Sequence, residues 1–212
     1  MSSLGLITNE TEAKAYCERW ADVQAMERLE QFRCLLLEEN QKQNLISKPS
    51  EELIWQRHFA DSAQLLEYVP RETVTIPKEP WLDLGTGAGF PGLIIAILRP
   101  DWPMVLVESR ARRVEFLERC SDTLSLDHCR VDGQRLERIS PFPVSVISAR
   151  AFAPLKKLLS LSAPFSTKST RYLLPKGRSA AHELEEQKKS IRAMFHVKQS
   201  LTDSDAGIIV SK

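Results

Sequence analysis

The first 70 residues carry apolar side chains at the spacing of amphipathic helices. A polar run over residues 40–44 interrupts this pattern, and a second helical segment is expected to begin near Pro49, with Ser50 as its cap. We therefore predict a small N-terminal helical cap over residues 1–70, joined to the rest of the chain by a proline-containing connector over 69–80. Apolar positions at helical spacing between residues 9 and 40 are Trp20, Val23, Met26, Leu29, Phe32, Leu35 and Leu36.

From Trp81 onward, short apolar runs alternate with helical patterns, which is typical of a parallel α/β sheet. We expect a Rossmann-like sheet with helices on both faces, in a domain over residues 71–212 that packs with the cap as one compact unit. Strands are predicted at 81–84, 104–108, 128–131, 144–148 and 170–175, with a terminal strand pair at 196–200 and 207–211. Helices are predicted at 91–98, 110–124, 154–163 and 179–195.

A glycine-rich turn links the first predicted strand to the first predicted helix of this domain. It reads Asp83-Leu84-Gly85-Thr86-Gly87-Ala88-Gly89-Phe90-Pro91-Gly92. Glycine lets the backbone adopt positive φ and lets a ligand approach without a Cβ clash. Because clustered glycines weaken a fold unless their conformation is needed, we expect a nucleotide-like ligand here rather than a tight turn alone.

Two acidic residues suggest which nucleotide-like ligand binds. The spacing Gly87-x-Gly89-x-x-Gly92 formally matches a dinucleotide-binding turn, but the Asp83 carboxylate would repel a pyrophosphate. The same carboxylate is favourable beside the sulfonium and ammonium groups of S-adenosylmethionine (SAM). Glu108 ends the second strand, 23 residues after Gly85, where it can accept hydrogen bonds from ribose hydroxyls. This combination predicts a SAM-dependent methyltransferase.

Composition narrows the class further. The chain has 212 residues, of which 42% are hydrophobic and 27% charged, enough to bury a core. It contains no apolar run of about 20 residues and no visible signal peptide, so we expect a cytoplasmic protein that does not cross a membrane. The four cysteines lack metal-ligand spacing, and no metal is expected. Nothing in the sequence demands a dimer, so we expect a monomer.

The small overall charge of +1 hides an asymmetry along the chain. Residues 1–70 carry a net charge of −5, whereas residues 110–178 carry +8. A basic stretch downstream of a cofactor site suits a polyanionic substrate such as RNA. A solvated charged surface is the alternative reading of the same residues.

Several motifs together resemble one family. Besides the glycine-rich turn, these motifs are Asn44-Leu45-Ile46-Ser47, Arg57-His58-x-x-Asp61-Ser62, Gly133-Gln134-Arg135-Leu136-Glu137, Ser148-Ala149-Arg150-Ala151-Phe152 and Pro175-Lys176-Gly177. From about residue 23 to the C-terminus, the chain is similar to the RsmG (GidB) family of 16S rRNA guanine-N7 methyltransferases. The resemblance implies that the substrate is the guanine at nucleotide 527, in the 530 loop of 16S rRNA, either as naked rRNA or in the 30S subunit.

The motifs supply candidate site residues. Arg150 follows the fourth strand, at the substrate side, and Lys176 ends the fifth, where it could meet phosphate. Asn44 and His58 are candidates with equally good structural readings, as a turn residue and a core histidine. Whether Arg150 touches SAM or only RNA stays open. The candidate active-site residues are Arg150, Lys176, His58 and Asn44. The candidate cofactor-binding residues are Asp83, Gly85, Thr86, Gly87, Gly89, Phe90, Glu108, Gln134, Arg135, Leu136, Glu137 and Arg150.

Methylation of guanine N7 does not require the catalytic motifs that other nucleic-acid methyltransferases use, and these motifs are absent from the sequence. N7 carries an in-plane lone pair and no proton, so its methylation needs alignment with the methyl group and no general base. No cysteine nucleophile and no Asn-Pro-Pro-Tyr-like motif follows the fourth strand. Two alternatives remain: a SAM-dependent methyltransferase acting on another RNA, a protein or a small molecule, and a non-catalytic nucleotide- or RNA-binding module.

Overall fold

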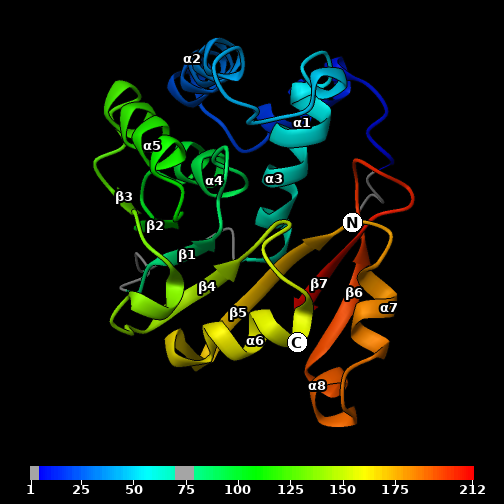
Figure 1. Ribbon diagram of the computed structural model, residues 1–212. Helices are drawn as coiled ribbons and strands as arrows, with labels where there is room; N and C mark the ends of the chain where they lie inside the picture. Colours follow the sequence, from blue (N-terminus) through cyan, green and yellow to red (C-terminus); the bar gives the residue numbers. More distant parts are fainter. Residues whose placement is uncertain (1–4, 70–78) are drawn as a thin grey trace.

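The computed structural model describes residues 5–69 and 79–212, and these residues form a seven-stranded sheet covered by helices on both faces (Figure 1). The predicted Rossmann-like α/β fold is confirmed, and its strands lie close to the expected positions. The strands are β1 (Trp81–Leu84), β2 (Met104–Val107), β3 (Cys129–Asp132), β4 (Val144–Ser148), β5 (Ser166–Lys176), β6 (Phe195–Gln199) and β7 (Gly207–Ser211).

The strand order of the sheet, β3-β2-β1-β4-β5-β7-β6, indicates where along its edge a ligand would bind. Strands β1 to β5 run parallel, while β7 is antiparallel to both β5 and β6, which confirms the terminal strand pair. The chain reverses its direction of winding between β1 and β4, which pair directly. In sheets of this kind, ligands bind beyond the carboxyl ends of the strands at such a reversal.

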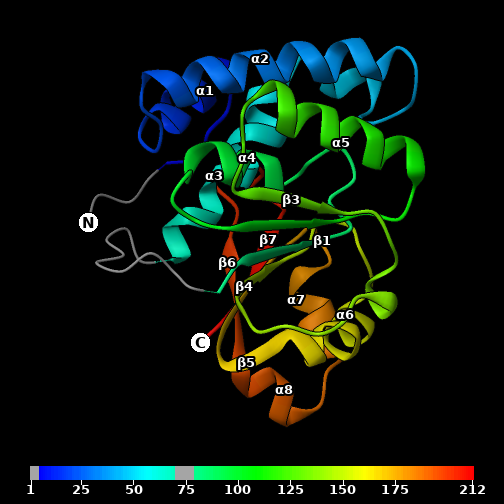
Figure 2. The same cartoon turned by 90° about the vertical axis from the view of Figure 1, so that its left-hand side faces the viewer.

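Helices on the two sheet faces enclose two separate apolar cores. Figure 2 shows α4 (Gly92–Leu98) and α5 (Ala111–Thr123) on one face, and α6 (Leu155–Ser162), α7 (Ala180–Glu185) and α8 (Lys189–Met194) toward the other. Along β1 the side chains alternate between the cores, with Trp81 in the first and Leu82 in the second. The sheet is therefore buried on both sides, and its carboxyl edge stays free for a site.

The N-terminal cap packs on the same side as α4 and α5 (Figure 2). The single helix expected over 9–40 is two helices, α1 (Glu10–Glu18) and α2 (Val23–Asn40). Asn9 caps α1 through a bond from the Glu12 amide, and Asp22 caps α2 through one from the Ala25 amide. The second cap thus starts a new helix inside what looked like one apolar stripe.

The segment after the polar loop is an irregular helix rather than the regular one expected. It passes through a 3₁₀ turn (Lys48–Ser50), a π-helical stretch (Trp55–Ala60), a short α-helical turn α3 (Asp61–Ala63) and a second 3₁₀ turn (Gln64–Tyr68). Ser50 does not cap it, because its hydroxyl bonds within the preceding turn to Ser47. π-helical stretches re-aim side chains and often accompany functional sites.

Two other expectations change in detail. The helix expected over 179–195 is divided into α7 and α8, and β5 begins at Ser166, four residues earlier than predicted. The predicted connector lies mostly at 70–78, outside the described residues, and the expected domain boundary at 70/71 falls there too.

Candidate functional site

The glycine-rich turn leaves the carboxyl end of β1 with three glycines at positive φ, Gly85 at +64°, Gly87 at +61° and Gly89 at +98°. A Cβ on Gly85 would lie 2.6 Å from the Phe152 ring, and one on Gly89 would lie 2.5 Å from Leu93. A Cβ on Gly87 would lie 3.5 Å from the Arg113 guanidinium and 3.8 Å from the Gly85 carbonyl, both ordinary contact distances. Gly85 and Gly89 are therefore required by packing, whereas Gly87 lines the first cavity, described below, where a ligand can approach the backbone.

Asp83 is fully buried beneath this turn, so our charge argument for SAM needs correction. One carboxylate oxygen accepts a 2.6 Å hydrogen bond from the Ser148 hydroxyl, and the other accepts the Gly92 amide at 3.0 Å. The same Ser148 hydroxyl accepts the Trp81 indole N–H at 2.8 Å. Burial raises the pKa of Asp83, and the bonds from Ser148 and Gly92 oppose that rise. Asp83 therefore holds the turn and does not face a ligand directly.

A cavity of about 510 Å³ opens above the turn, between the cap and the sheet. Its walls come from parts of the chain that are distant in sequence, from the cap to the C-terminal strands. Predicted site residues in its wall are Gly85, Thr86, Gly87, Phe90, His58, Arg150 and Lys176. Residues that we had not assigned to the site include Ser47, Arg57, Asp61, Arg113, Thr202 and Asp203.

A second cavity, of about 360 Å³, adjoins the first and shares Gly85, Arg113 and Ala151 with it. The predicted cofactor-binding residues that follow the second and third strands lie together in its wall. They are Glu108, Gln134, Arg135, Leu136 and Glu137. The two cavities together form an elongated site that runs along the carboxyl edge of the sheet.

Glu108 lies at the base of the second cavity and is only 6% exposed. One of its oxygens accepts the amides of Ser109 and Arg110, at 2.7 and 2.9 Å, which fixes the carboxylate at the start of α5. The other lies 3.7 Å from the Arg113 guanidinium, close enough for an ion pair. Glu108 thus presents a fixed carboxylate oxygen toward the space where a ribose would bind, while Arg113 stands at the junction of the two cavities.

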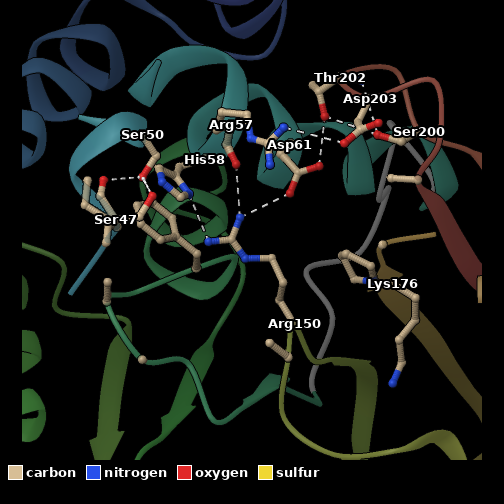
Figure 3. A pocket seen from close by; sticks show the side chains of 18 of the residues that line it. Ser47, Ser50, Arg57, His58, Asp61, Arg150, Lys176, Ser200, Thr202 and Asp203 are labelled. Atoms are coloured by element: carbon tan, nitrogen blue, oxygen red, sulfur yellow. Dashed lines mark hydrogen bonds and ion pairs between the residues drawn. The ribbon is translucent and has the colours of Figure 1, made fainter. Parts of the chain in front are cut away.

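Arg150 enters the first cavity from the end of β4 and contacts the cap (Figure 3). Its guanidinium donates to the Arg57 carbonyl at 3.2 Å and to Asp61 Oδ2 at 3.1 Å, and it lies 3.1 Å from His58 Nδ1. It also lies over the Phe90 ring, 5.0 Å from the centroid. The structure thus brings three of the predicted site residues, Arg150, His58 and Phe90, into direct contact.

His58 is a neutral imidazole in this arrangement. Burial of the ring, together with the nearby positive charges of Arg150 and Arg57, lowers its pKa from 6.5 to about 3. Since Nδ1 accepts from Arg150, the proton resides on Nε2, which is buried without a hydrogen-bond partner. The ring stacks on Phe90 with centroids 4.8 Å apart. His58 consequently has no free lone pair with which to accept a proton from a substrate.

The C-terminal loop, which we define as residues 200–206 between β6 and β7, closes the first cavity against the cap. The Thr202 hydroxyl donates to Asp61 Oδ1 at 2.9 Å, and Asp203 lies 3.5 Å from the Arg57 guanidinium. Inside the loop, the side-chain amide of Gln199 donates to three backbone carbonyls. The loop is therefore an ordered wall of the site, joined to the cap by hydrogen bonds and an ion pair.

Lys176 lies in the cavity wall but does not offer a free charge, contrary to our expectation. Its ammonium donates to the Ala153 carbonyl at 2.8 Å and to Glu183 at 2.9 Å, and the residue is only 9% exposed. Figure 3 shows the side chain directed away from the Arg150 contacts. A buried ammonium paired with a carboxylate stabilises the start of α7 and is a poor partner for phosphate.

Asn44 and Gly89, both predicted site residues, lie outside the two cavities. Asn44 is exposed, and the asparagine that organises its loop is Asn40. The Asn40 side chain accepts the amides of Leu45 and Ile46 at 2.8 and 2.9 Å. The other residues of the Asn44 motif, Leu45, Ile46 and Ser47, line the first cavity, and Gly89 serves the packing of α4.

Residues 5–69 and 79–212 contain neither a membrane-spanning helix nor a cluster of metal ligands. Among these residues no helix is long and apolar enough to span a bilayer. Within the same ranges, no three acidic, histidine or cysteine side chains converge in a way that could hold a metal ion.

Comparison with solved structures supports the fold at low sequence identity. The chain superimposes on a fibrillarin/Nop5p complex chain with a TM-score of 0.56 and 15% identity, over 76% of this chain and 83% of the other. It superimposes on precorrin-6y C5,15-methyltransferase of Geobacter metallireducens with a TM-score of 0.53 and 11% identity, over 80% and 91%. These likenesses show the methyltransferase-type fold and carry no information on the substrate.

Sequence comparison is more specific. The chain is 50% identical to the ribosomal RNA small subunit methyltransferase G of Erythrobacter litoralis, over 98% of each chain. It is also 50% identical to the protein of that name from Novosphingobium aromaticivorans, over 97% of this chain and 89% of the other. Residues 25–208 match the family described as rRNA small subunit methyltransferase G. With the glycine-rich turn, Glu108 and Arg150 placed around one elongated site, the chain belongs to the rRNA small subunit methyltransferase G family.

Proposed function

We propose that this protein transfers the methyl group of SAM to N7 of a guanine in 16S rRNA, at nucleotide 527 of the 530 loop. Family membership supports the enzyme class and the rRNA substrate. One observation carries the assignment to an acceptor without a proton: the histidine of the site, His58, is neutral and its only lone pair is taken by Arg150. A site built this way can hold and align a base but cannot deprotonate it through that residue.

The cavities suit SAM as methyl donor. Gly87 lines the first cavity at positive φ, so the backbone can approach the amino-acid end of the cofactor. Glu108 has a fixed carboxylate oxygen for the ribose hydroxyls. The segment from Gln134 to Glu137 lines the side of the second cavity where the adenine would lie. When bound, SAM supplies an electrophilic methyl group on a sulfonium.

The reaction needs no proton transfer. The N7 lone pair forms the new carbon–nitrogen bond while the carbon–sulfur bond breaks, so the sulfonium becomes a neutral thioether and the base becomes cationic. The protein must bring N7 into line with the methyl group and keep water out. Arg150 suits contact with guanine O6 or a neighbouring phosphate, because a cation against N7 itself would oppose the developing charge.

The excess of basic residues in 110–178 fits a polyanionic partner. Extruding a base from RNA costs a few kcal/mol, and contacts between these basic side chains and phosphates would offset that cost. A cytoplasmic location, expected from the sequence, agrees with an rRNA substrate, and we expect the protein to act on it as a monomer. Naked rRNA and assembled 30S subunits remain two possible forms of the substrate.

The test is methyl transfer from isotope-labelled SAM, with 30S subunits, free 16S rRNA and total cell protein offered in parallel. The 30S subunits must come from cells that lack this activity, so that the target is unmodified. Label is expected in RNA, and nuclease digestion should release it as 7-methylguanosine from the 530 loop. Label found in protein, on another base or at another guanine would refute the proposed substrate.

A further inference from the structure

We propose that Asp61 is the residue that positions Arg150 for methyl transfer, by holding the guanidinium in one orientation at the substrate side of the cavity. The inference rests on the proposed function, since it concerns alignment of the rRNA base. Asp61 belongs to α3, 89 residues before Arg150 in sequence, and the two form an ion pair at 3.1 Å (Figure 3).

Arg150 is held by three acceptors and one ring. Of these, the Arg57 carbonyl and His58 Nδ1 are neutral, while the Phe90 ring supports the guanidinium face. Among the residues that the structure describes, the carboxylate in an ion pair with Arg150 is that of Asp61. Because charge-assisted hydrogen bonds to arginine are about twice as strong as neutral ones and directional, Asp61 dominates the orientation of this side chain.

Asp61 is itself fixed, which a positioning residue requires. Its Oδ1 accepts from Thr202 at 2.9 Å and from the Gln64 side-chain amide at 2.8 Å, leaving Oδ2 for Arg150. The side chains of Asp61 and Arg150 are 19% and 24% exposed, so water screens the pair only in part. One carboxylate therefore joins the cap, the end of β4 and the C-terminal loop.

The two carboxylate oxygens of Asp61 have different partners: Oδ1 binds Thr202 and Gln64, and Oδ2 binds Arg150. In Asp61→Asn, the remaining carbonyl oxygen can still accept from Thr202 and Gln64, because those two donors favour that amide orientation. The amide nitrogen then faces the Arg150 guanidinium, donor against donor. The substitution thus spares the loop contact and removes the hold on Arg150.

We expect Asp61→Asn to lower kcat for methyl transfer roughly 10- to 100-fold, the range for loss of one charge-assisted hydrogen bond. The Kd for SAM and the melting temperature should stay close to those of the parent protein. Asp101→Asn is the matched control, since it also neutralises an aspartate paired with an arginine, but that pair with Arg99 lies between α4 and β2, outside both cavities. It should leave kcat unchanged.

The decisive experiment is a double-mutant cycle on 30S subunits with Asp61→Asn, Arg150→Ala and both together. If Asp61 acts through Arg150, the double variant should be no slower than Arg150→Ala alone, because removing a positioning residue has no effect once its target is gone. Losses that multiply would overturn the inference, as would an Asp61→Asn variant with unchanged kcat. If the parent protein does not methylate rRNA, the proposed function is wrong and this inference falls with it. If the parent is active but the rate losses of the two single variants multiply in the double variant, only the inference is wrong.

Discussion

Replacing His58 by asparagine should make the free energy of unfolding less sensitive to acid. Asparagine keeps a hydrogen-bond acceptor near the position of Nδ1, so the contact with Arg150 can persist, but it does not titrate. In the folded parent protein the pKa of His58 is about 3, far below its ordinary value of 6.5, because the ring is buried and faces Arg150 and Arg57. The two forms should therefore diverge as the pH falls.

The sign and size follow from proton linkage. Between pH 6.5 and 3 the unfolded parent chain binds a proton at His58 that the folded chain does not, so stability falls as the pH drops through 6.5. The slope is about 1.4 kcal/mol per pH unit. At pH 5 the parent should have lost about 2 kcal/mol relative to pH 7 through this residue.

Urea denaturation of both proteins at pH 7 and pH 5, at one ionic strength, measures the effect. Carboxylates titrate in both proteins and cancel in the difference between them. The gap in free energy of unfolding should shift by about 2 kcal/mol in favour of the variant at pH 5. Parallel pH dependence of the two proteins would show that His58 titrates near its ordinary value, and its assignment as a neutral acceptor would be wrong.

Three further predictions concern the turn and the cofactor cavity. Gly92→Ala should lower the free energy of unfolding, measured with urea, by about 1–3 kcal/mol, because the new Cβ would lie 2.8 Å from Asp83 Oδ2. Gly177→Ala is the control and should change this free energy little, because no atom lies within 4 Å of its Cβ position. Ser148→Ala should cost about 2–4 kcal/mol by thermal or urea unfolding, since two buried groups lose their partner; a cost under 1 kcal/mol would count against this hydrogen-bond chain. Glu108→Gln should weaken SAM binding about tenfold by calorimetry with little change in melting temperature, and unchanged affinity would separate this carboxylate from the ribose.

The sheet and its glycine-rich turn could be predicted because their signals are local. Apolar runs of strand length alternate with helical patterns, and the glycines cluster where β1 ends. The irregular helix of the cap could not be predicted this way. Its π-helical stretch begins where the Glu10 carboxylate accepts the amides of Trp55 and Gln56, and that partner comes 45 residues earlier.

The errors at the site have the same physical origin. A sequence shows that Asp83 ends a strand but not that a serine 65 residues later captures its carboxylate. Lys176 reads as a free cation until folding brings Glu183 within 2.9 Å of it. Thr202 and Asp203 read as an ordinary polar turn, because their partners Asp61 and Arg57 lie about 140 residues away.

The contacts of the C-terminal loop also bear on the order in which the site is completed during synthesis. The Ile7 amide bonds the Leu201 carbonyl at 2.7 Å, and Gln64 bonds the Leu201 amide at 2.8 Å. Both partners emerge from the ribosome long before residue 201, and contacts of such large sequence separation form late and slowly. Until translation has passed the C-terminal loop, Asp61 lacks its Thr202 donor and Arg57 lacks its Asp203 partner. The wall of the substrate cavity in a nascent chain is therefore completed by contacts that form later than those of the glycine-rich turn and of Arg150.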